Sequence, residues 1–305
     1  MSAVARNLFP EENENVPQVL DVVLNSSGQH LAVRHTSVKL VGELGDWINH
    51  HPGYLESILN WLLYGLQEPK LASQAANSLS NICSQCQKQM TQHFEPLVHI
   101  LNSLDSFKLK AQAAQGLIKG ASLLINNMSH DKVMLCMKTL IDLQLGPIVR
   151  LVNFSPNSHF QNLDFDKIHI FKISILTKIH IFRLLDTYNQ NGTKVARQTT
   201  SDPVLYLDRL ATIFRHVQLE LQPGEEHPAA QLAIQDVWPV VSRTCSIFPQ
   251  DSRIMERTCR TLRFVIRCIG TQSAPLVEPL VKLLVSLYIV HPHSCFLYLV
   301  SNDPL

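Results

Sequence analysis

Apolar positions recur every three to four residues along most of the chain, which is the spacing of one face of an α-helix. This pattern predicts three pairs of amphipathic helices before residue 150: 31–50 with 53–67, 70–87 with 90–103, and 107–126 with 129–143. It resumes in four further segments: 203–218, 229–246, 252–269 and 275–290. Proline and glycine stand between helices where the chain has to turn, as in His51-Pro52-Gly53. The fold class is therefore predicted to be all-α.

A short motif repeats within these helices. The six residues QAANSL at 74–79 return as QAAQGL at 112–117, and HTSVKL at 35–40 stands one unit earlier. The spacings are 38 and 39 residues, from 112 − 74 and 74 − 35. A period near 40 residues with helical patterning is typical of stacked helix pairs of the HEAT or armadillo kind. We therefore predict a HEAT/ARM-type α-solenoid, a right-handed superhelix of antiparallel helix pairs.

Residues 151–183 depart from this pattern. They contain no alanine, glycine or glutamate, and their apolar residues alternate, with IHIF at 168–171 and again at 179–182. Such alternation predicts β-strand. The residue bias fits AT-rich codons, and Val152-Asn153 and Phe182-Arg183 can be encoded by splice-site sequences, so one hypothesis is a translated intron. The alternative is a genuine loop or β-hairpin. The chain is thus divided into helical repeats at 1–150, an insert at 151–183, repeats at 184–299 and a tail at 300–305.

Five arginines follow one face of the predicted helix 252–269: Arg253, Arg257, Arg260, Arg263 and Arg267. At about 100° per residue they fall within an arc of roughly 120°, opposite a face of isoleucine, leucine, valine and methionine. Phe264 lies inside the arginine arc. Only Glu256 offers a carboxylate within this face, so four positive charges are expected to remain uncompensated. Guanidinium forks match carboxylate and phosphate oxygens. The face is interpreted as a receptor for an extended acidic or phosphorylated chain, and the alternative is an ordinary solvated helix face.

The composition and the short motifs of the chain argue against several classes of function. The 26 Lys+Arg and 25 Asp+Glu residues give a net charge of +1, so direct nucleic-acid binding is not expected. Seven scattered cysteines are interpreted as reduced core thiols of an intracellular protein, and Cys83-x-x-Cys86 has no second pair with which to hold a metal. No apolar run reaches about 18 residues, so no membrane span is expected. Without a phosphate-binding loop, a nucleophile elbow or a spaced ligand set, the chain is predicted to be no enzyme and to carry no cofactor.

Several segments resemble the transportin-SR (transportin-3) branch of the importin-β nuclear transport receptors: residues 32–43, 76–86, 107–120, 201–216 and 291–299. This resemblance implies a HEAT superhelix that shuttles between cytoplasm and nucleus and imports phosphorylated Arg/Ser-rich proteins under the control of the GTPase Ran. It also implies that an arginine-rich helix binds the phosphorylated Arg-Ser tract of the cargo. The positions that match that helix are Arg253, Arg257, Arg260, Arg263 and Arg267.

The resemblance covers a central part of the family's fold, so we expect an incomplete array in which the N-terminal arch with the main Ran site is absent. The likeness ends at Leu299, where Val300-Ser301 can be encoded by a second unspliced donor. The alternative function is a HEAT scaffold that binds an acidic protein segment without a transport role.

Overall fold

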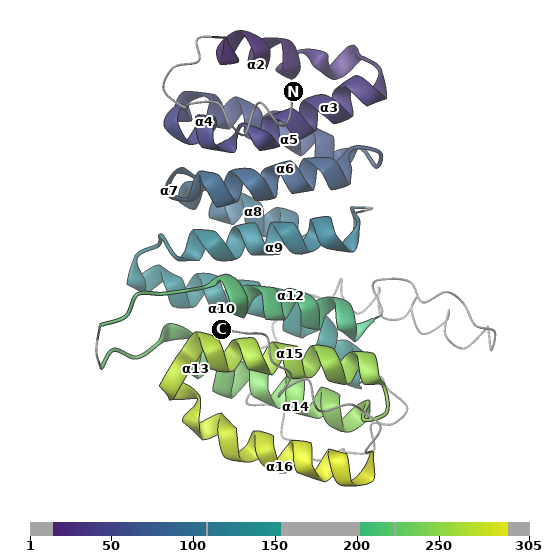
Figure 1. Ribbon diagram of the computed structural model, residues 1–305, viewed down its shortest axis with the longest axis vertical. Coiled ribbons are helices and arrows are strands. Elements are labelled where there is room, and N and C mark those ends of the chain that lie inside the picture. The colour runs from purple at the N-terminus through teal and green to yellow at the C-terminus, as the bar shows by residue number, and fades with distance from the viewer. Residues whose placement is uncertain (1–14, 108, 154–201, 223, 292–305) are drawn as a thin grey trace, which may run out of the picture.

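The computed structural model describes residues 15–107, 109–153, 202–222 and 224–291. In these residues helices stack one above another into an elongated array (Figure 1), which confirms the predicted all-α solenoid. In chain order the α-helices are α2 (Val16–Leu24), α3 (Leu31–Glu43), α4 (Gly45–His50), α5 (Leu55–Gln67), α6 (Ala72–Gln85), α7 (Gln87–Met90), α8 (Phe94–Asn102), α9 (Ala111–Ile125), α10 (His130–Asn153), α12 (Pro203–His216), α13 (Pro228–Leu232), α14 (Trp238–Ile247), α15 (Ser252–Ile269) and α16 (Ala274–Val290).

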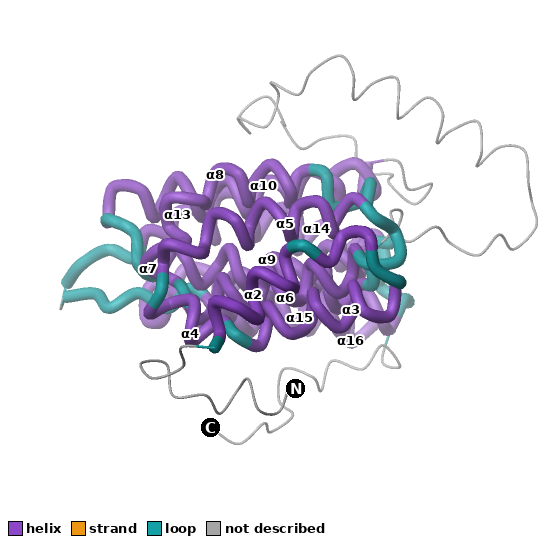
Figure 2. Tube along the Cα trace, turned by 90° about the horizontal axis from the view of Figure 1, so that it is seen from above, coloured by secondary structure: helices purple, strands orange, loops and turns teal. Residues whose placement is uncertain are grey.

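The helices form two layers, which separate when the array is seen along its length (Figure 2). In the first layer α3, α6, α9, α12 and α15 follow one another, and each packs against the next. The second layer contains α5, α8, α10 and α14. Apolar faces meet between the layers and bury Ile58, Leu97, Leu117 and Leu210. Each unit thus covers the apolar face of its neighbour, as stacked repeats require.

Small residues bring first-layer helices close together. The Ser78 hydroxyl of α6 donates a hydrogen bond to the Val38 carbonyl of α3 at 2.7 Å, and the Ser80 hydroxyl donates to the Gly116 carbonyl of α9 at 2.6 Å. A Cβ atom added at Gly42 would lie 2.7 Å from the Ser78 Cα atom. The spacing of α3 and α6 therefore depends on a glycine at position 42.

The second-layer helix α10 is longer than the pattern predicted. It was expected to end at 143 but continues to Asn153, because Leu145, Ile148 and Val152 extend its buried face at helical spacing. Residues 151–153 of the predicted insert thus belong to α10. The rest of 151–183 lies outside the described residues, so the strand and intron hypotheses remain predictions. The array resumes at α12, which packs against both α9 and α10.

The segment 229–246, predicted as one helix, contains a π-helical turn at Ala233–Val237 between α13 and α14. Pro239 follows this turn and has no N–H for the helical hydrogen bond, and its ring crowds the carbonyl of Gln235. The turn places Asp236 3.3 Å from the ammonium of Lys138 on α10, which also pairs with Asp142. The irregular turn thereby supplies an ion pair between neighbouring units.

The described cysteines are all free. Burial raises the pKa of the Cys83 and Cys86 thiols to about 12. The Cys86 thiol donates to the Gly45 carbonyl at 3.3 Å. These thiols therefore pack as apolar groups, and within the described residues no group of three or more His, Cys, Asp or Glu side chains lies together.

The last described helix, α16, has an apolar outer face. Val281, Val285, Tyr288 and Ile289 are all more than half exposed. By length and composition alone, the helical stretch Ser252–Val290 could cross a membrane, since an 18-residue window has a mean hydropathy of 1.6 and is 17% buried. No membrane span was expected here because Glu278 and Lys282 interrupt the apolar run in α16. A single such helix assigns no membrane role.

Candidate functional site

The arginine-rich helix α15 forms where the sequence predicted it, at Ser252–Ile269. The Asp251 carboxylate caps its start by accepting from the backbone N–H groups of Arg253 and Ile254, and the chain leaves it through Gly270 at φ 56°. Its apolar face packs inward as predicted, and the buried residues of that face include Ile254, Met255, Leu262, Val265 and Ile269. The arginines are thereby held along the surface beside α12.

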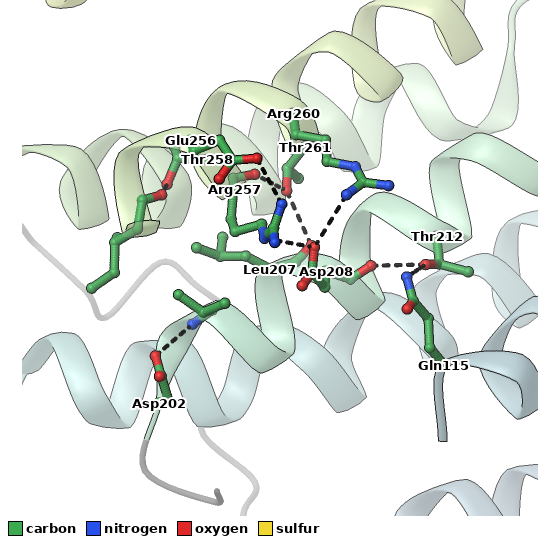
Figure 3. Close-up of polar contacts among 12 residues, drawn as sticks. Gln115, Asp202, Leu207, Asp208, Thr212, Glu256, Arg257, Thr258, Arg260 and Thr261 are labelled. Atoms are coloured by element: carbon green, nitrogen blue, oxygen red, sulfur yellow. Dashed lines mark hydrogen bonds and ion pairs between the residues drawn. The ribbon is translucent and has the colours of Figure 1, made fainter. Parts of the chain in front are cut away.

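Carboxylates pair with the N-terminal arginines of this helix. The Arg253 guanidinium lies 3.3 Å from Asp202 and 3.1 Å from Asp251. Arg257 Nε lies 3.2 Å from Asp208 of α12, and its terminal nitrogen lies 2.7 Å from Glu256 (Figure 3). The expectation of four uncompensated charges is therefore wrong. Asp202 and Asp208 precede the helix by more than 40 residues, and only the packing of α12 on α15 brings them there.

The ion pairing between the arginines of α15 and nearby carboxylates weakens at Asp208. Arg260 also points toward its carboxylate (Figure 3), but at 3.8 Å, beyond hydrogen-bond distance. Burial raises the pKa of Asp208, against the opposing effect of Arg257 and Arg260. The partly buried Asp208 carboxylate thus pairs closely with Arg257 and only loosely with Arg260.

The C-terminal arginines line a groove of about 790 Å³ between α12 and α15. Arg260, Arg263 and Arg267 form one wall, and Arg215 and His216 at the end of α12 contribute to the other. Three of the five predicted site residues therefore share one groove, whereas Arg253 and Arg257 do not line it. Sequence reasoning missed Arg215 and His216, since basic residues in a last helical turn are ordinary favourable partners of the helix dipole.

Phe264 supports two of these guanidinium groups. Its ring is buried, with Arg215 Cζ over it at 5.4 Å and Arg263 Cζ at 5.3 Å from the centroid. Cation–π attraction over an aromatic face limits the freedom of both side chains. The sequence placed Phe264 within the arginine arc, and the structure places its ring beneath the guanidinium groups. Charges from two helices are thus held at one position.

A smaller groove of about 190 Å³ adjoins the first, between α9 and α12. Arg215, His216, Arg260 and Phe264 line both grooves, and Lys119 of α9 lines only the smaller one. The pKa of His216 is lowered to about 4, first by burial and then by the charges of Lys119 and Arg215. His216 is therefore neutral at pH 7.

Asn126 holds the chain that borders both grooves. Its side-chain amide donates to the His216 carbonyl at 3.0 Å and accepts from the Gln218 N–H at 2.9 Å. This pair of bonds satisfies backbone groups that the end of α12 would otherwise leave without a partner. The end of α12 is thus tied to the end of α9.

Cys268 lines the larger groove, 3.8 Å from Nε2 of His227. His227 Nδ1 accepts from the Ala229 N–H at 3.0 Å, so in the neutral ring the proton is on Nε2 and faces the sulfur. Burial raises the pKa of Cys268 to about 12 and lowers that of His227. A protonated thiol beside an imidazole N–H is not an activated nucleophile.

Known proteins resemble this chain along most of its length. Family models of the transportin-3/importin-13 third and fourth TPR domains match residues 13–100 and 227–302. Transportin MOS14 of Arabidopsis thaliana is 23% identical over 309 residues, covering 98% of this chain and 27% of that protein. Importin-13 of Homo sapiens is 18% identical over 293 residues, covering 96% and 28%.

The solved structure of importin-13 in its cytosolic state has the same fold. It superposes with a TM-score of 0.64 at 15% sequence identity, over 91% of this chain and 28% of that one. The chain spans about a quarter of the length of these relatives. Since domains of a single group of transport receptors match residues 13–100 and 227–302, and the chain has the fold of importin-13, the chain belongs to the importin-β family.

Proposed function

We propose that this chain serves nuclear protein import and that its arginine groove binds phosphorylated Arg/Ser-rich segments of cargo proteins. The observation that carries the proposal is the convergence of Arg260, Arg263 and Arg267 with Arg215 of another helix on one groove of about 790 Å³. Family membership supports the transport role, shuttling between cytoplasm and nucleus and dependence on Ran. No catalytic step is proposed.

Phosphate suits this groove better than carboxylate does. A phosphorylated serine carries about −1.5 to −2 charges and three acceptor oxygens, so it can satisfy several guanidinium groups at once. The groove presents more cations than carboxylates: Glu256 is the acidic side chain among its lining residues, and it is already paired with Arg257. A ligand with more than one negative charge per side chain would balance the excess positive charge of the groove.

A HEAT scaffold that binds an acidic segment is the second candidate. The same helix already pairs Arg253 and Arg257 with Asp202 and Asp208, so its surface is able to accept carboxylates. The two candidates differ in the ligand charge that they require, and binding experiments separate them.

The test uses the chain of residues 1–305 and three labelled peptides of equal length: an Arg-Ser repeat phosphorylated on serine, the unphosphorylated repeat, and an acidic peptide of matched net charge. Fluorescence anisotropy should show the phosphorylated repeat binding at least about tenfold more tightly than either control, from one or more charge-assisted contacts. Replacing both Arg260 and Arg263 with alanine should remove that preference. Equal binding of the acidic peptide would favour the scaffold, and equal binding of the unphosphorylated repeat would reject both candidates.

A further inference from the structure

The smaller groove holds Lys119 of α9, a cation that the larger groove lacks, beside Arg215, which lines both grooves. Lys119 of α9 and Arg215 of α12 are exposed and line the smaller groove together with the amide side chains of Gln112 and Gln115. No carboxylate lines this groove, and among the described residues none lies within ion-pair distance of Lys119 or Arg215. Two uncompensated cations beside a polar hollow are a place for an anion.

The local charges and the packing of the side chains both support an anion site in the smaller groove. Burial is the main cause of the lowered pKa of His216, and the charges of Lys119 and Arg215 lower it further, so both cations lie near this one side chain. The Phe264 ring lies beneath Arg215 on the boundary between the two grooves. Because four residues line both grooves, the two grooves are adjacent, and an extended chain that occupied both would cross these shared residues.

We propose that Lys119 and Arg215 form a second anion subsite, so that one extended polypeptide places one phosphoryl group against Arg260, Arg263 and Arg267 and another between Lys119 and Arg215. This inference rests on the proposed function and adds the number of phosphates that the site recognises. The ligand is a multiply phosphorylated polypeptide.

The extent of the positive surface favours a polypeptide over a nucleic acid. Beyond Lys119 the first layer continues with α6, whose exposed side chains include the neutral Asn77, Asn81 and Gln85. Double-stranded DNA carries one charge for about every 1.7 Å of its axis and requires a longer track of cations. A positive surface that ends at α9 instead suits a short segment with a few phosphates.

The experiment compares Arg-Ser peptides of one length with one or two phosphoserines, and uses a single-stranded oligonucleotide as a third probe. The wild-type chain should bind the doubly phosphorylated peptide about tenfold more tightly than the singly phosphorylated one. Lys119→Ala should reduce this gain to no more than about threefold and leave affinity for the singly phosphorylated peptide within about threefold of wild type, since Lys119 does not line the larger groove. Lys119→Arg should keep the gain because it retains the charge.

Lys39→Ala, at an exposed first-layer position on α3 outside both grooves, is the matched control and should leave the gain intact. Nuclear magnetic resonance should show the pKa of His216 rising when the doubly phosphorylated peptide binds, because an anion then offsets the two cations. A second phosphate that adds no affinity, or a gain that survives Lys119→Ala, overturns the subsite. Oligonucleotide binding as tight as that of the doubly phosphorylated peptide, lost in the same variant, overturns the polypeptide assignment. Absence of binding to the singly phosphorylated peptide overturns the proposed function itself.

Discussion

Asp208 Oδ1 of α12 lies 3.2 Å from Nε of Arg257 and 3.8 Å from a terminal nitrogen of Arg260. This carboxylate divides the arginine face of α15 into two parts. Arg253 and Arg257 on one side bind carboxylates of the same chain and join α15 to the start of α12. Arg260, Arg263 and Arg267 on the other side line the groove. One helix face therefore has both a structural and a proposed binding role.

Replacing Asp208 with asparagine should strengthen binding of a phosphorylated Arg-Ser peptide severalfold, because the neutral amide no longer attracts Arg260, which lines the groove. Burial raises the pKa of Asp208, so its ionised form is less favourable in the folded protein, and the loss of its ion pairs should change the free energy of unfolding by no more than about 1 kcal/mol. Calorimetry and urea denaturation measure the two quantities. A weaker complex would contradict this competition.

Removing Asp105 should cost more stability than removing its partner, the buried Arg209 of α12. Its side chain is 6% exposed and both terminal nitrogens lie 3.1 Å from Asp105, which is 38% exposed and also accepts from the Tyr206 hydroxyl. Asp105→Ala leaves a buried guanidinium without this carboxylate and should cost about 3 kcal/mol. Arg209→Met leaves a hydrated carboxylate and should cost about 1 kcal/mol.

Urea denaturation of both single variants and of the double variant tests this asymmetry. The double variant should be more stable than Asp105→Ala alone, because the unpaired guanidinium is gone. Equal losses of unfolding free energy in the two single variants would show that the burial of Arg209 does not determine the size of the loss.

Replacing Gly42 with alanine should destabilise the array, although alanine is the better helix former by about 1 kcal/mol. The new Cβ would lie 2.7 Å from the Ser78 Cα atom, a backbone atom that cannot rotate away, so overpacking should cost about 1–3 kcal/mol. Gly116→Ala is the matched control, because its nearest atom is the Ser80 hydroxyl at 3.3 Å. Thermal unfolding should show a lower Tm for Gly42→Ala than for the control, and the reverse order would argue against close packing of α3 on α6.

Stability should fall as the pH is lowered from 6.5 toward 4. The pKa of His216 is lowered to about 4 and that of His227 is also lowered, so below pH 6.5 the unfolded chain takes up protons that the folded chain does not. Their contribution is thus present above pH 6.5 and is lost as the pH falls. His216→Gln should flatten the pH dependence of the unfolding free energy between pH 6.5 and 5. An unchanged pH dependence in His216→Gln would contradict this assignment.

Local pattern was sufficient to predict the repeating helix pairs and the arginine face. Apolar spacing and the 38 and 39 residue periods located α3, α6 and α9, and the spacing of Arg253 to Arg267 predicted the surface of α15. The π-helical turn at Ala233–Val237 was not predicted, because Pro239 acts through missing and crowded backbone contacts that apolar spacing does not report.

The division of the arginine face into a paired part and a groove-lining part could not be predicted from the sequence, for a different reason. Asp202, Asp208 and Arg215 belong to a helix that precedes α15 by about 40 to 50 residues, and only its packing gives them roles in the site. Arg215 in particular has no distinguishing local pattern. Its role emerges from the Phe264 ring that lies beneath it and from the two grooves that it borders.

The most direct measurement compares two double variants for both stability and affinity toward a phosphorylated Arg-Ser peptide. Arg253→Ala with Arg257→Ala should lower the free energy of unfolding by about 1–2 kcal/mol and change affinity by no more than about threefold, because these side chains already bind Asp202 and Asp208. Arg263→Ala with Arg267→Ala should weaken binding at least about thirtyfold and lower the free energy of unfolding by no more than about 1 kcal/mol, the size of the cation–π contact between Arg263 and Phe264. Equal losses of affinity in the two variants, or a larger loss in the first, would contradict the division of α15 into a structural and a binding part.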